Sequence, residues 1–196
     1  WPQAAEPGAT SPVLEAARLS ADRAILGRRS ARGFADAPLD PAQLGALAVA
    51  ALARTSADAR AALSLAAVVH RVRGVASGHY AWDAAASRWR LVRGADLRDD
   101  LVRTCLGQSL AGEAAVALVV LGDVDAVQAR WGARGARDAY VEAGRIAHRI
   151  YLAAGALGLG ARNLAAFVDD SLSRLLGLRG DPRVALHLTL VGAPSR

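Results

Sequence analysis

The longest periodic segment of the chain lies between residues 136 and 158. Its apolar side chains recur at steps of three and four residues: Ala139, Ala143, Ala147, Ile150, Ala154 and Leu157. This spacing places them on one face of a long helix. Capping residues and apolar positions predict shorter helices at 20–27, after Asp40 and Pro41, at 97–105 and at 169–177.

Strand patterns occupy the middle and the end of the chain. Residues 183–192 alternate between apolar and other side chains, which is typical of a strand with one buried face. Residues 63–72 are rich in β-branched side chains, and 114–121 form an apolar run, so both predict buried strands. The runs 79–83 and 88–92 predict a hairpin in which Trp82 and Trp89 pair. The mixture indicates an α+β fold, with helices flanking a central, mostly antiparallel sheet.

Composition narrows the class of protein. The 196 residues are 53% hydrophobic and 21% charged, which suits one globular domain over 20–196 after a loose lead-in at 1–19. The single cysteine, Cys105, excludes an internal disulfide and favours a cytoplasmic location. The chain has no apolar run long enough to span a membrane. Its His, Asp and Glu spacing forms no ligand set, so we expect no metal site.

Every one of the 24 basic residues is arginine. The absence of lysine excludes a Schiff base, a Walker-type phosphate site and a lysine base supplied by this chain. The net charge of +6 alone would allow nucleic-acid binding. However, the arginines are scattered and no aromatic residues interleave with a basic run, so we expect none.

The strongest local signal is a cluster of polar residues after the first predicted helix: Arg28, Arg29, Ser30 and Arg32. Guanidinium and hydroxyl groups on one turn suit the oxygens of a phosphate. The alternative is a solvated basic turn that binds only water or an acidic neighbour.

With Phe34, this cluster resembles the opening motif of the nitroreductase-type flavoproteins. Other segments resemble one branch of them, the SagB-type dehydrogenases, which oxidise azoline rings in ribosomally made peptides. These segments occur in the family's order at 72–80, 91–98, 106–108, 142–144, 158–160 and 175–178. Together they extend over roughly residues 20–194.

The resemblance implies a nitroreductase-like fold, an FMN cofactor and a homodimer with flavin sites at the subunit interface. It places the FMN phosphate on the four cluster residues, with Arg196 as a further contact. It implies that the backbone amides of Leu164, Ala165 and Ala166 lie near the reducible nitrogen of the flavin. It also places Ser56 and Ala57 in a segment that runs along the flavin.

The chain also departs from the family pattern. Asp58 stands where the flavin segment has a glycine, and Arg130 and Trp131 replace the Lys-Tyr pair of the azoline oxidases. Arginine stays protonated and cannot act as an ordinary base. Because imidazole titrates near neutral pH, His148 is the first candidate for the base, and Tyr140 is the second.

Three functions therefore remain open. The first is an FMN-dependent oxidoreductase that oxidises azoline rings, or a similar C–H bond, in a peptide natural product. The second is a catalytically degenerate subunit that scaffolds or completes the site of an active partner. The third is a nitroreductase-fold protein with another electron acceptor. In each case we expect a homodimer or a heterodimer with a related chain.

Overall fold

The computed structural model describes residues 21–195, so the lead-in, Ser20 and Arg196 lie outside the described residues. Six strands form one sheet in the order β3-β2-β1-β4-β6-β5, and every neighbouring pair is antiparallel. Their bounds are β1 Leu63–Val69, β2 Gly78–Asp83, β3 Arg88–Gly94, β4 Val116–Asp123, β5 Gly160–Leu164 and β6 Arg183–Gly192. Helices flank this sheet, which confirms the predicted α+β fold.

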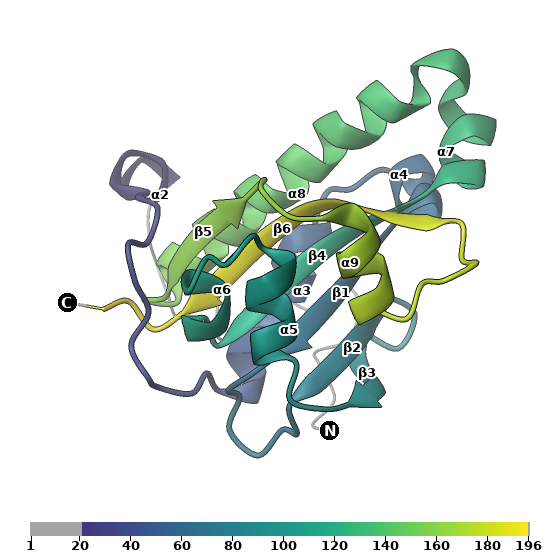
Figure 1. The fold of residues 1–196 in the computed structure, drawn as a ribbon. Coiled ribbons are helices and arrows are strands. Elements are labelled where there is room, and N and C mark those ends of the chain that lie inside the picture. The colour runs from purple at the N-terminus through teal and green to yellow at the C-terminus, as the bar shows by residue number, and fades with distance from the viewer. Residues whose placement is uncertain (1–20, 196) are drawn as a thin grey trace.

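The helices form two layers, one on each face of the sheet (Figure 1). Helices α3 and α8 cover one face, and α5, α6 and α9 cover the other. The helix bounds are α2 Ala21–Gly27, α3 Pro41–Leu52, α4 Ala57–Ala62, α5 Arg98–Thr104, α6 Leu110–Glu113, α7 Val124–Trp131, α8 Gly135–Ala156 and α9 Asp169–Leu175. Among residues 21–195, no helix is long and apolar enough to cross a membrane.

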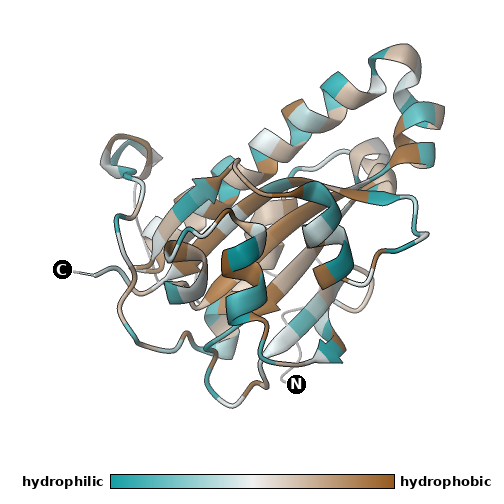
Figure 2. Ribbon diagram, in the orientation of Figure 1, coloured by the Kyte–Doolittle hydropathy of each residue, from teal (hydrophilic) through white to brown (hydrophobic). Residues whose placement is uncertain are grey.

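The central strands are buried on both faces, which explains their nearly continuous apolar runs. In β1, Leu65 and Ala67 pack toward α3 and α8, whereas Ala66 and Val68 pack toward α5 and α9. The hydropathy colouring shows the same apolar centre between the helical layers (Figure 2). Two hydrophobic clusters therefore hold the fold together, separated by the sheet itself.

The periodic face predicted for the long helix is the buried face of α8. Ala139, Ala143 and Ile150 are almost fully buried there. The opposite side of α8 is exposed and carries Tyr140, at 58% exposure, together with His148. The helix runs over Gly135–Ala156, close to the predicted 136–158.

The predicted hairpin is confirmed as β2 and β3, and the Trp82 and Trp89 rings meet edge to face with centroids 5.2 Å apart. The strand predicted at 63–72 ends earlier, at Val69. Beyond that point the amides of His70 and Arg71 both donate to the Ala115 carbonyl, so the chain turns away. Helices α4, α6 and α7 and strand β5 were not predicted as elements.

The edge strand β3 carries several exposed arginines beside the exposed Leu91 and Val92. Arg88, Arg90 and Arg93 are all exposed on this strand, which pairs only with β2 in the described sheet. Charged side chains on an edge strand discourage the addition of another strand.

Candidate functional site

The arginine cluster lies along the outer edge of β5, at the opposite side of the sheet from β3. Ser30 forms a parallel bridge with Ala161, and the Ala31 amide donates to the Ala161 carbonyl over 2.8 Å. The Arg162 guanidinium donates to the Ala31 carbonyl over 3.2 Å. These bonds fix the backbone of the cluster, although its side chains belong to a loop.

Phe34 anchors the end of the same segment. Its side chain is buried against Gly192, where β6 ends, and Gly160, where β5 begins. A methyl group on Gly192 would lie 2.8 Å from the Phe34 ring and 3.2 Å from a backbone nitrogen. Glycine is therefore required under the ring, and the phenylalanine of the motif has a structural role.

A groove of about 280 Å³ opens between α2, α8 and β5. Its lining includes Arg23, Arg28, Arg29, Tyr151, Gly155 and Ala161. The Arg28 guanidinium lies 5.3 Å from the centroid of the Tyr151 ring, within the range of a cation–π interaction. Gly155 has no atom within 4 Å of where a Cβ would stand, so its missing side chain leaves the groove open.

Tyr151 is a site residue that sequence reasoning missed. Its hydroxyl accepts the Asn163 amide N–H over 2.9 Å and lies 3.1 Å from the Ser30 hydroxyl. The side chain thus joins α8, β5 and the arginine cluster. The only signal in the sequence was a phenol within an alanine-rich helix face, because a buried tyrosine hydroxyl needs a hydrogen-bond partner.

The four cluster residues have different environments. Arg28 and Arg29 line the groove, and Arg29 also donates to the carbonyls of Leu26 and Arg28, each over 2.9 Å. Ser30 is held by Tyr151. Arg32 is exposed and is not part of the groove lining. The predicted Arg196 contact lies outside the described residues.

The predicted amide donors follow β5. Leu164 ends the strand and is buried, whereas Ala165 and Ala166 are exposed. Within residues 21–195, no acceptor takes the amide N–H of Ala165 or Ala166. The side chain of Gln108 donates to the Ala166 carbonyl over 3.2 Å, which fixes this turn. Two ordered amides are therefore available to an acceptor on a ligand.

The predicted flavin segment lies elsewhere in the chain. Ser56 caps α4, where its hydroxyl accepts the Ala59 amide N–H over 3.1 Å, and Ala57 begins that helix. Helix α4 lies beside α7, whereas α2 and the arginine cluster lie at the other end of α8 (Figure 1). One chain therefore does not bring Ser56 and Ala57 to the groove.

The two candidate bases share the exposed side of α8 but are separated along it. They are eight residues apart, a rise of about 12 Å at 1.5 Å per residue. His148 is less than one turn from Tyr151, which lines the groove, and Tyr140 is two turns farther away. His148 is thus the nearer of the two to the groove.

Glu142 has a structural role. It is 9% exposed and accepts hydrogen bonds from Arg145 over 3.2 Å and from Arg149 over 3.1 Å. Arg149 also donates to the Ala51 carbonyl and the Thr55 hydroxyl, over 2.8 and 2.9 Å. This clamp ties α8 to the end of α3. In the part of the chain that the structure describes, no group of three His, Cys, Asp or Glu side chains could hold a metal ion.

Comparison with known proteins places this arrangement in a family. The model of the nitroreductase family matches residues 25–192. A protein of Methanocaldococcus jannaschii named as a nitroreductase, MJ1384, is 28% identical over 169 residues, which cover 81% of this chain and 84% of that protein.

Solved structures show the same fold. A protein of Anabaena variabilis named as a nitroreductase superposes with a TM-score of 0.79 and 25% identity. The match covers 88% of this chain but only 37% of the length of the Anabaena protein. The Escherichia coli microcin synthetase McbBCD complex, solved with truncated pro-MccB17 bound, contains a chain that superposes with a TM-score of 0.74 and 18% identity. That match covers 86% of this chain and 70% of the other.

Proposed function

The chain belongs to the nitroreductase family, and from that premise we propose that it is an FMN-dependent oxidoreductase acting on a peptide natural product. The reaction we propose is the oxidation of an azoline ring, or of a similar C–H bond. We place it in the cytoplasm, as a dimer with itself or with a related chain. The observation that supports this best is the groove beside the arginine cluster.

The residues of the groove fit the polar parts of FMN. Arg28 and Arg29 offer guanidinium groups for the phosphate, and charge-assisted hydrogen bonds of this kind are strong. Ala165 and Ala166 are not part of the groove lining, but they follow β5, which contributes Ala161 to it, and their unbonded amides suit the acceptor atoms of the flavin ring. When bound, FMN would supply the two-electron oxidation by accepting a hydride from the substrate carbon.

The protein would position the substrate and move its proton. His148 is exposed beside the groove and is the side chain we propose to take the acidic ring proton. The chain has no lysine that could act as the base, and Tyr140 is the second candidate for this role. In a dimer, Tyr140, Ser56 and Ala57 of one copy could serve the groove of the other, which would account for their separation within one chain.

The peptide substrate is supported by the fold comparison. The structure of the McbBCD microcin synthetase contains a chain of this fold together with truncated pro-MccB17. The likeness to that complex is one of fold, so the substrate class is our proposal for this chain.

A second function has its own support. The hydroxyl of Ser56 is already used to cap α4, and Arg130 and Trp131 stand in α7 where the azoline oxidases have their Lys-Tyr pair. These features favour a degenerate subunit that completes the site of a lysine-bearing relative. The two candidates differ in whether the chain oxidises anything alone.

The decisive experiment begins with the absorption spectrum of the purified chain. A flavin spectrum, followed by oxidation of a synthetic thiazoline-containing peptide with loss of two hydrogens by mass spectrometry, supports the enzyme. A flavin spectrum with oxidation only after addition of a lysine-bearing relative supports the subunit. A colourless protein that also refuses added FMN contradicts the oxidoreductase.

The base is tested by replacing each candidate alone. We expect His148→Ala to lower the turnover about 10²–10⁴-fold while its flavin content stays the same, because general-base catalysis contributes that much. Tyr140→Phe is the matched variant on the same exposed helix side. If both variants turn over normally, the base comes from a partner chain or the acidity of the substrate itself suffices.

A further inference from the structure

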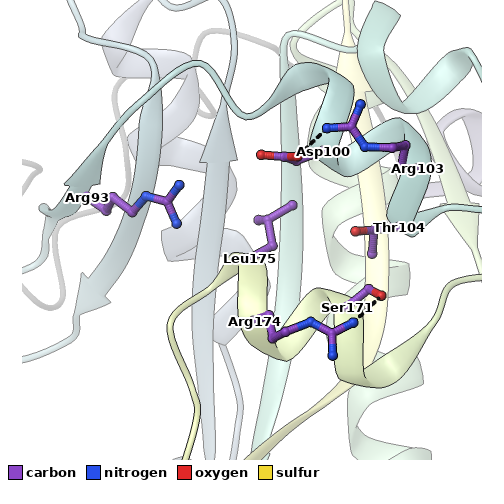
Figure 3. A pocket seen from close by; sticks show the side chains of 7 residues that line it. All are labelled: Arg93, Asp100, Arg103, Thr104, Ser171, Arg174 and Leu175. Carbon is purple, nitrogen blue, oxygen red and sulfur yellow. Dashed lines mark hydrogen bonds and ion pairs between the residues drawn. The ribbon is translucent and has the colours of Figure 1, made fainter.

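A second arginine-lined cavity lies on the face of the sheet opposite α8. It has a volume of about 380 Å³, is open to solvent and lies between β3, α5 and α9 (Figure 3). Its polar lining consists of Arg93, Arg103, Arg174, Asp100, Thr104 and Ser171. We call this cavity the α5–α9 pocket. The sheet separates it from the groove at the arginine cluster.

The register of the sheet explains how Arg93 reaches the pocket. Arg93 pairs with His79 across the hairpin, and His79 pairs with Val68 in β1. Val68 belongs to the hydrophobic cluster under α5 and α9, so all three residues share that face. Arg93 therefore projects from the edge strand toward the two helices, as Figure 3 shows.

The positive charges in the α5–α9 pocket exceed the negative ones. Arg103 is paired with Asp100, the one carboxylate of the lining. Arg174 donates to the Ser171 hydroxyl over 2.9 Å and forms no ion pair with a carboxylate in the described part of the chain. Arg93 has no ion pair with any carboxylate of residues 21–195. Among the residues that the structure describes, these two guanidinium groups thus face the cavity without an ion-pair partner.

The environment of His79 agrees with this excess of positive charge. Burial is the main cause that lowers the pKa of His79 to about 4, and the charges of Arg183, Arg90 and Arg93 lower it further. No acidic group offsets them there. Arg93 thus contributes positive charge on the face of the sheet that carries the α5–α9 pocket.

We propose that the α5–α9 pocket binds the phosphate group of a small phosphorylated molecule. Two free guanidinium charges match a phosphate dianion. Its three terminal oxygens can accept from the guanidinium groups and from the two hydroxyls. A single carboxylate carries one charge and only two acceptor oxygens, so it would leave donors unused. Apart from Leu175 the lining is polar, so the phosphate itself is the part recognised.

The test is a titration of the isotopically labelled chain, in its purified state, followed by its backbone amide signals. Inorganic phosphate is added at constant ionic strength above neutral pH, with sodium chloride as the reference salt. We expect saturable shifts at Thr104, Ser171 and Arg174. AMP and glycerol phosphate, titrated the same way, distinguish the source. Tighter binding of AMP points to a nucleotide, and equal binding points to the phosphate ester in general.

Substitutions decide whether the shifts report this pocket. Arg93→Gln combined with Arg174→Gln removes the two uncompensated charges and should weaken phosphate binding at least about tenfold. Arg179→Gln is the matched control, since Arg179 is exposed on the turn after α9 and is not part of the lining. If the double variant does not fold, the Arg93→Gln variant is tested alone. The Arg93 side chain is exposed, so its replacement should leave the fold intact.

Three results would overturn the proposal. One is the absence of any saturable shift at the pocket. Another is an equal shift with sodium chloride. The third is an unchanged phosphate affinity in the folded Arg93 and Arg174 variants. None of these results bears on flavin binding at the groove, so this proposal and the proposed function can fail separately.

Discussion

The groove beside β5 and the α5–α9 pocket are each lined by three arginines, yet they are built differently. In the groove, Arg28 and Arg29 are neighbours in the chain, and backbone bonds to β5 hold them in place. In the pocket, Arg93, Arg103 and Arg174 come from three elements that only the folded sheet brings together. An arginine cluster of the first kind can be predicted from the sequence, whereas one of the second kind can be identified only from the folded structure.

The two sites also differ in what surrounds the charges. The groove offers an aromatic ring, a missing side chain at Gly155 and no carboxylate in its lining. The pocket offers hydroxyls and a partly compensated charge. We therefore expect the groove to take a ligand with a flat ring and a phosphate, and the pocket to take a phosphate alone.

The largest expected effect is a loss of stability of the folded chain in acid, caused by buried histidines on the face of the sheet that carries the α5–α9 pocket. Burial is the main cause that lowers the pKa of both His70 and His79 from 6.5 to about 4. Below pH 6.5, the pKa of histidine in the unfolded chain, both imidazoles bind a proton in the unfolded chain but stay neutral in the folded chain. The free energy of unfolding should therefore fall as the pH drops from 6.5 toward 4, by roughly 2 kcal/mol per histidine at about pH 5.

Urea denaturation at neutral pH and at about pH 5 measures this loss. Burial also lowers the pKa of His187, so His79→Gln removes one of three such groups and should reduce the loss by its own share, roughly 2 kcal/mol at about pH 5. His148→Gln is the control, because His148 is exposed on α8. A pH dependence that is unchanged by His79→Gln would mean that this imidazole is charged in the folded chain.

The next effect tests whether the two arginine sites bind different ligands. Arg28→Gln together with Arg29→Gln should weaken FMN binding about a hundredfold, because each charge-assisted bond contributes about 1.5–3 kcal/mol. The pair Arg93→Gln and Arg174→Gln should leave the FMN affinity unchanged. Flavin fluorescence titration measures both. Equal losses in the two variants would place the flavin phosphate in the α5–α9 pocket and contradict different ligands for the two sites.

A smaller effect concerns the phenol that joins the groove to the sheet. Tyr151→Phe removes a hydroxyl bonded to the Asn163 amide and close to Ser30. It should lower the free energy of unfolding by about 1–2 kcal/mol, since a buried donor loses its partner. Tyr140→Phe, on the exposed side of the same helix, should change it by less than about 0.5 kcal/mol. Equal changes in chemical denaturation would contradict the assigned role of Tyr151.

The smallest expected effect tests whether a small residue at position 155 of α8 keeps the groove open. Gly155→Ala places a methyl group in open space and should raise the stability by up to about 0.5–1 kcal/mol through helix propensity. The same methyl narrows the groove, so FMN affinity should fall. Gly144→Ala is the matched control, with equally open surroundings but outside the groove lining. An equal loss of flavin in both variants would mean that a change in helix packing, rather than a narrower groove, lowers the FMN affinity.

The parts of the fold that repeat a pattern over many residues were predictable. The apolar face of α8 and the alternation in β6 each recur several times, so a single irregular residue does not hide them. Helices α4, α6 and α7 have eight residues or fewer and bury few side chains, so neighbouring elements rather than periodicity define them. Strand β5 is short and half exposed, and its pairing with β6 determines its state.

For the site, the sequence indicated the side chains that are close in the chain. Arg28 and Arg29 do line one groove, as neighbours on a turn can. Tyr151 and Gly155 lie more than a hundred residues away, and only the contact of α8 with β5 brings them to the cluster. The α5–α9 pocket could not be predicted, because its arginines share no local pattern.

The two edges of the sheet limit how copies of this chain can associate. Along β5 the outer backbone is already engaged by Ser30 and Ala31. At β3 a row of guanidinium groups would face the same row on a second copy, and like charges in register repel. Joining two sheets into one continuous sheet is thus disfavoured at both ends. Association of folded copies should proceed through helical surfaces, and cross-strand ladders between molecules should be absent.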